Sequence, residues 1–135
     1  MVRVGPEARL EPTQIALQFQ VAESVVQTAR VGAWVRSQPG QQIRVLARLA
    51  ELRGPNGPVP VTAVTWTGAV AQSAAGGHQA RCANGAFVAG QAQDLVLGWH
   101  NSGTLTCDIA FTVAAPGSLS PGVYSGTVDL ALSVQ

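Results

Sequence analysis

The chain has 135 residues, of which 47% are hydrophobic, 11% charged and 5% aromatic, and its formal net charge is +1 with eight Arg and no Lys. Soluble domains usually contain about 25% charged residues, and a chain this apolar and this weakly charged is not a disordered segment. Its near-neutral balance excludes the basic face that binding to nucleic acid needs, and no apolar run approaches the roughly 20 residues of a membrane-spanning helix.

The first thirteen residues differ from the rest of the chain. Residues 1–13 contain two Pro, one Gly and four charged side chains, with few apolar residues between them. This composition is too polar for a core element and predicts an N-terminal arm. The arm precedes a single domain over residues 14–135, which is long enough to form one hydrophobic core.

The first strand signal lies in residues 14–21. Its apolar side chains alternate with Gln and Ala, and they are Ile15, Leu17, Phe19 and Val21. Alternation with a period of two indicates a half-buried strand. Two interpretations stay open because both need this pattern. Residues 14–22 are either the first strand of their own domain or a donor strand that completes the sheet of a neighbouring subunit.

Pro and Gly at short intervals divide the remaining chain into segments of strand length, which is typical of an all-β sandwich or barrel. Residues 41–52 fit a helix by propensity, but the surrounding β pattern and the stop at Arg53-Gly54-Pro55 favour a strand. Residues 93–99 and 104–113 are predicted to form a hairpin, and residues 123–134 the last strand. A total of about seven to eight strands predicts an immunoglobulin-like antiparallel β-sandwich.

The two cysteines, Cys82 and Cys107, do not have the spacing of a zinc site. A disulfide between them is favoured over two buried free thiols, and it indicates an oxidising compartment. Residues 1–6 are not followed by the apolar stretch of a signal peptide. We therefore expect an extracellular or cell-surface protein from which the signal peptide has been removed.

Residues that carry chemistry are few and scattered. His78 and His100 are the two histidines and are expected to be solvated loop residues. No Ser stands in a Gly-x-Ser-x-Gly motif, and the seven acidic residues are dispersed along the chain. The sequence therefore predicts no catalytic residue, no metal site and no cofactor, and we expect that the protein is not an enzyme.

Three tryptophans, Trp34, Trp66 and Trp99, are the candidates for contact with a ligand. If their rings are exposed and coplanar, they are able to stack on sugar rings. The alternative, which is more common in β-sandwiches, is that they anchor the core or the sheet edges.

The end of the chain reads Leu119-Ser120-Pro121-Gly122-Val123-Tyr124-Ser125-Gly126-Thr127-Val128-Asp129-Leu130-Ala131-Leu132. This segment resembles the final hairpin of secreted bacterial β-sandwich proteins, among them pilus subunits, proteins of the spore coat protein U type and immunoglobulin-like surface domains. Pro-Gly makes the turn, and the tyrosine is expected to fill the end of the sandwich with its hydroxyl bonded to backbone.

Together with the donor-strand pattern, the resemblance implies a structural subunit of an extracellular filament or surface layer, assembled by β-strand complementation. Its partners would be copies of itself and an assembly chaperone, without nucleic acid or a membrane span. Two other functions are compatible with the sequence. One is a monomeric extracellular module for carbohydrate binding or adhesion, and the other is a phage capsid or tail decoration protein.

Overall fold

Alternating apolar and polar residues form long strands through most of the molecule. The computed structural model describes residues 7–21, 25–114 and 116–135. Within these ranges there is no α-helix, and three short 3-10 turns occur, η1 (Val61–Ala63), η2 (Gly76–Gln79) and η3 (Pro116–Ser118). The strands are β1 (Glu7–Glu11), β2 (Gln14–Val21), β3 (Val26–Arg36), β4 (Ile43–Gly54), β5 (Gly57–Val59), β6 (Val64–Ala75), β7 (Arg81–Cys82), β8 (Gly85–Ala86), β9 (Gln93–Asp94), β10 (Val96–Leu97), β11 (Gly103–Val113) and β12 (Gly122–Val134).

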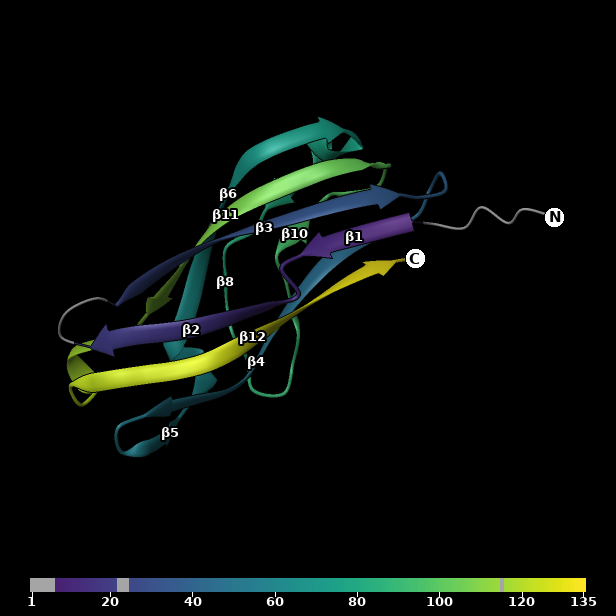
Figure 1. Ribbon diagram of the computed structural model, residues 1–135. Helices are drawn as coiled ribbons and strands as arrows, with labels where there is room; N and C mark the ends of the chain where they lie inside the picture. Colours follow the sequence, from purple (N-terminus) through teal and green to yellow (C-terminus); the bar gives the residue numbers. More distant parts are fainter. Residues whose placement is uncertain (1–6, 22–24, 115) are drawn as a thin grey trace.

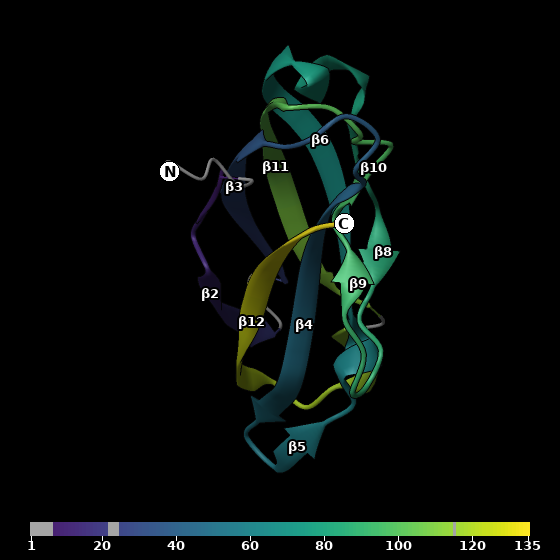
Figure 2. The same ribbon diagram turned by 90° about the vertical axis from the view of Figure 1, so that its right-hand side faces the viewer.

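Two large sheets contain the long strands. Sheet A has the order β1-β3-β11-β6-β8, and sheet B has the order β2-β12-β4-β5 with β9 also paired to β4. Figure 1 shows β6, β11 and β3 above β2, β12 and β4, and Figure 2 shows the same two layers after a quarter turn. Each strand pair in the described residues is antiparallel, so the prediction of an all-β fold with antiparallel sheets is confirmed.

The inward faces of both sheets form one hydrophobic core. One cluster of buried residues contains Leu49 of β4 and Val128 of β12 from sheet B together with Phe111 of β11 and other apolar residues of sheet A. The described residues include no buried polar or charged side chain. The strand interpretation of residues 41–52 is confirmed by β4, because its apolar residues alternate into the core from Ile43 onward.

The predicted N-terminal arm is part of the fold over half of its length. Residues 7–11 form β1, which pairs with residues 32–36 of β3 at the edge of sheet A. Residues 1–6 lie outside the described residues. The chain then passes through Pro12 and Thr13 into β2 at the edge of sheet B. The predicted boundary at residue 13 therefore lies between two strands of the same structure. Residues 7–11 form a strand without alternating apolar side chains, because their backbone pairs with β3 at the sheet edge.

The predicted hairpin of residues 93–99 with residues 104–113 is wrong. β11 pairs with β3 on one side and β6 on the other, and residues 93–99 contain only the two short strands β9 and β10. Leu95, Val96 and Trp99 are all buried, and Gly98 has a φ of +73°, so the segment turns within the core instead of alternating. The described residues form twelve strands and not the predicted seven to eight, and five of the twelve have only two or three residues.

Residues 76–102 close one side of the molecule. β8 extends sheet A beside β6, β9 extends sheet B beside β4, and β7 pairs with β10 between them. Phe87 and Trp99 from this segment are buried without measurable exposure. The opposite side is formed by the two N-terminal edge strands, β1 in sheet A and β2 in sheet B.

Candidate functional site

The donor-strand candidate β2 lies in the sheet of its own chain. Its residues pair antiparallel with β12, from Gln14 opposite Asp129 to Val21 opposite Gly122. The side chains of Ile15, Leu17, Phe19 and Val21 are 1–6% exposed and fill the core between the sheets. The structure therefore places these four residues as the sequence pattern requires, with their groove supplied by the same molecule.

Among the described residues, the side chain of Gln27 is hydrogen-bonded to the outer edge of β2. The amide of Gln27 on β3 accepts a hydrogen bond from the Gln18 N–H at 2.7 Å and donates one to the Ala16 carbonyl at 2.8 Å. A primary amide thus takes the place that the peptide group of a further strand would take. Because N–H and C=O of one residue point to the same side of an antiparallel strand, the even-numbered residues Ala16 and Gln18 direct these groups to Gln27, and the odd-numbered residues direct theirs to β12. Nothing in the sequence around Gln27 indicates this contact.

The predicted disulfide is confirmed. Cys82 on β7 and Cys107 on β11 are bonded, with their Cα atoms 5.9 Å apart. β7 does not pair with β11. Instead, β6 pairs with β11, and Gly68 of β6 lies close to both Cys82 and the Ala83 carbonyl. The bond therefore fixes the closing segment of residues 76–102 to the middle of sheet A.

The three tryptophans do not form one stacking platform. Trp66 and Trp99 are 2% and 0% exposed, and their indole N–H groups donate to the Ala83 and Asn101 carbonyls at 3.1 and 2.8 Å. Trp66 also packs against the ring of Phe87 at a centroid distance of 4.8 Å. Trp34 is different, since it is 42% exposed on the outer face of sheet A. A ligand at the surface therefore meets Trp34 alone.

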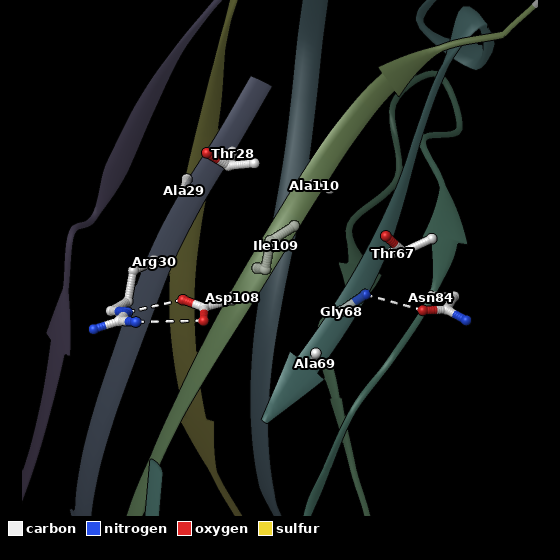
Figure 3. Close-up of a pocket in the computed structure, with 10 residues that line it drawn as sticks. All are labelled: Thr28, Ala29, Arg30, Thr67, Gly68, Ala69, Asn84, Asp108, Ile109 and Ala110. Atoms are coloured by element: carbon white, nitrogen blue, oxygen red, sulfur yellow. Dashed lines mark hydrogen bonds and ion pairs between the residues drawn. The ribbon is translucent and has the colours of Figure 1, made fainter. Parts of the chain in front are cut away.

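A hollow of about 880 Å³ lies on the outer face of sheet A, where short side chains follow one another across the strands. Ala110 of β11 lies opposite Thr28 of β3 and Thr67 of β6, and these residues leave room that larger side chains would fill. Figure 3 shows this surface with Arg30 and Asp108 on one side and Asn84 on the other. The Asn84 side-chain oxygen accepts a hydrogen bond from the Gly68 N–H at 2.9 Å.

Arg30 and Asp108 form the charged border of this hollow. The Arg30 guanidinium donates two hydrogen bonds to the carboxylate, at 2.8 and 3.3 Å, and both side chains are more than half exposed. The guanidinium lowers the pKa of Asp108 below its ordinary value, chiefly through this hydrogen bond, and the carboxylate raises the pKa of Arg30. The two residues lie 78 positions apart, so only the strand register brings them together.

The histidines do not gather other reactive groups. The His78 Nδ1 and the Ser73 hydroxyl are 2.8 Å apart in an exposed position near η2. Within residues 7–21, 25–114 and 116–135, no group of three or more His, Cys, Asp or Glu side chains is placed to hold a metal ion. No helix in these ranges is both long and apolar enough to cross a membrane.

Comparison with known proteins gives no relative: no family model, no curated protein and no solved structure matches the chain at a significant level.

Proposed function

We propose that this protein is a structural subunit of an extracellular filament or surface layer, and that its subunits join by exchanging β2. In the assembled state, β2 of one subunit lies beside β12 of the next and inserts Ile15, Leu17, Phe19 and Val21 into its core. Such exchange is a form of strand addition, in which backbone pairing gives affinity and alternate side chains give specificity. A chaperone that covers the open groove before exchange is part of the same proposal.

The strand order is the observation that carries this proposal. In an immunoglobulin-like sandwich, strands B, E and D lie in one sheet and strands C, F and G in the other. The strands β3, β4, β6, β11 and β12 follow one another as B to F do, and the pairings β3-β11-β6 and β12-β4 correspond to B-E-D and F-C. The place of strand G, next to F, is taken by the N-terminal strand β2. A strand supplied from the far end of the chain is also one that a second copy is able to supply.

The energetics of β2 suit an exchangeable element. Fully burying a side chain such as Leu or Phe contributes about 1.5–3 kcal/mol, so the four buried side chains of β2 contribute about 6–12 kcal/mol wherever the strand comes from. On its other edge β2 is held by the Gln27 side chain and not by a strand among the described residues. Exchange between copies restores the same contacts, and the low charged fraction of 11% favours close packing of subunit surfaces.

The proposal is tested by locking β2 to its own β12. Gln18 and Ser125 lie opposite each other with exposed side chains, and the register of β2 makes them a pair without mutual hydrogen bonds, in which side chains are closest. We expect Gln18→Cys combined with Ser125→Cys to form a second disulfide and to remain monomeric. Under the same concentration and mild-urea dialysis, the unmodified chain forms linear oligomers in size-exclusion chromatography and negative-stain microscopy.

The matched control is Gln18→Ser, which changes the same surface without a cross-link and is expected to oligomerise like the unmodified chain. Mass spectrometry under non-reducing conditions checks that the Cys82–Cys107 bond is intact in both variants. Strand exchange is refuted if the locked variant polymerises as well as the control, or if the unmodified chain stays monomeric throughout.

A further inference from the structure

Trp34 stands in a small hollow on the outer face of sheet A. Arg9 of β1 lies directly opposite Trp34 on one side, and Thr104 of β11 lies opposite on the other. One row further along the strands, Gly32 takes the central position between Glu11 and Thr106. These residues line a hollow of about 150 Å³, together with the exposed indole of Trp34.

Gly32 has no structural reason to be glycine. A Cβ at this position would meet only the Thr106 hydroxyl oxygen, at 3.5 Å, which is ordinary van der Waals contact, and its φ is not in the left-handed region. Every other glycine within a described strand has a positive φ or a Cβ position within 3.0 Å of another atom, as at Gly68 and Gly85. Glycine weakens a strand and often marks the place where a ligand approaches the backbone closely.

The groups around the hollow are available to a ligand. The indole N–H of Trp34 donates to no protein group among the described residues, unlike those of Trp66 and Trp99. Arg9 and Glu11 form no ion pair within the described chain, whereas Arg30 is paired with Asp108 on the same face. The hollow thus offers one exposed aromatic face together with unpaired donors and acceptors.

We propose that this hollow binds one ring of a neutral saccharide. The charges of Arg9 and Glu11 cancel, which disfavours an ionic ligand and leaves a carboxylate to accept from ring hydroxyls and a guanidinium to donate to them. The C–H face of a pyranose lies flat against the Trp34 indole, and Gly32 leaves the space that the ring occupies. The two threonine hydroxyls complete the polar rim. On the same face, β3 and β11 also line the hollow of about 880 Å³, so the ring belongs to a chain of sugars and not to an enclosed monosaccharide.

The test titrates the full chain with four neutral oligosaccharides, cellohexaose, xylohexaose, mannohexaose and β-1,3-glucan hexaose, and follows tryptophan fluorescence and calorimetric heat. Since Trp34 is the exposed tryptophan of the three, a bound sugar changes its emission. We expect binding of at least one of them, and a loss of affinity of about tenfold or more in Trp34→Ala and in Gly32→Val. Gly32→Val is expected to raise the midpoint of thermal unfolding at the same time, because a β-branched residue suits a strand.

The matched control is Thr127→Val, an exposed threonine of β12 in sheet B and therefore away from the outer face of sheet A, and it is expected to bind like the unmodified chain. The inference is overturned if none of the four sugars binds, or if the binding is equal in the unmodified chain and in Gly32→Val. The gain in thermal stability distinguishes a blocked hollow from a misfolded protein. Sugar binding is read from fluorescence and heat, whereas strand exchange is read from the oligomeric state, so failure of one proposal is distinguishable from failure of the other.

Discussion

At the scale of single residues, several side chains contact residues that are distant in the sequence. The Tyr124 hydroxyl donates a hydrogen bond to the Ser120 carbonyl at 2.6 Å, and the ring covers Gly54 of the neighbouring strand. The expected role of the tyrosine is confirmed in this detail, whereas its glycine partner is not apparent from the sequence. Arg30 and Asp108 are a second such pair, and here the contact has a consequence that depends on pH.

We expect Asp108→Asn to lower stability at neutral pH and to have no such effect in acid. The pKa of Asp108 is lower in the folded chain than its ordinary value because Arg30 donates to the carboxylate. A lowered folded-state pKa contributes stability above the unfolded-state pKa of about 3.9, and that contribution is lost as pH falls through the folded value. The pair is exposed, so the effect is small. Urea midpoints of the two chains at pH 7 and at pH 2.5 measure it.

The control for this prediction repeats both measurements in an Arg30→Gln background. Without the guanidinium, the cost of Asp108→Asn is expected to be the same at both pH values. An equal cost at pH 7 and pH 2.5 in the presence of Arg30 would contradict the prediction.

At the scale of elements, alternation identified strands but did not identify their partners. The patterns of β2, β4 and β12 predicted their extent and their buried faces, since each has a period of two along one sheet. Residues 93–99 have the same apolar content, but their backbone turns at Gly98 and buries Leu95, Val96 and Trp99, which do not alternate. The candidate sites depend on register between strands, so the sequence offered Trp34 as one of three tryptophans and gave no reason to group it with Arg9 and Gly32.

The Gln27 bridge to β2 gives a prediction at this scale. Gln27→Met retains the length of the side chain and removes both hydrogen bonds to the β2 edge. Since the bonds are exposed, we expect the free energy of unfolding to fall by about 1 kcal/mol. The amide hydrogen of Gln18 is expected to exchange with solvent at least about tenfold faster, because it loses its acceptor. Native-state hydrogen exchange by NMR measures this directly.

Gln18→Met is the matched control, because only the backbone of Gln18 takes part in the bridge and its side chain is exposed. Its amide protection is expected to remain that of the unmodified chain. Unchanged exchange at residue 18 in Gln27→Met would show that the amide is protected by something other than this side chain.

At the scale of the whole molecule, the two sides of the sandwich are closed in different ways. One side is covered by residues 76–102, which pair with both sheets and carry the disulfide partner Cys82. The other side has β1 and β2, which lie at the sheet edges, where β1 pairs only with β3 and β2 only with β12 among the described strands. One side is thus fixed covalently, whereas β2 on the other side is held by non-covalent contacts, namely pairing with β12, burial of its side chains and the Gln27 bridge, and this is the arrangement that strand exchange needs.

The same asymmetry predicts what removal of the disulfide does. In the chain-entropy description, a bond that closes a loop with a sequence separation of 25 contributes about 3–4 kcal/mol by restricting the unfolded chain. We therefore expect Cys82→Ala combined with Cys107→Ala to unfold at lower urea concentration, with a free energy of unfolding reduced by about that amount. Amides of β7 and β10 lose protection first, because these two-residue strands pair mainly with each other, while the β2 amides that bond to β12 are expected to keep the protection that they have in the unmodified chain. The unmodified chain in reducing agent is the control and should approach the variant. Equal loss of protection in β2 and β7 would contradict the independence of the two sides, and an unchanged free energy of unfolding would show that the bond adds nothing to the fold.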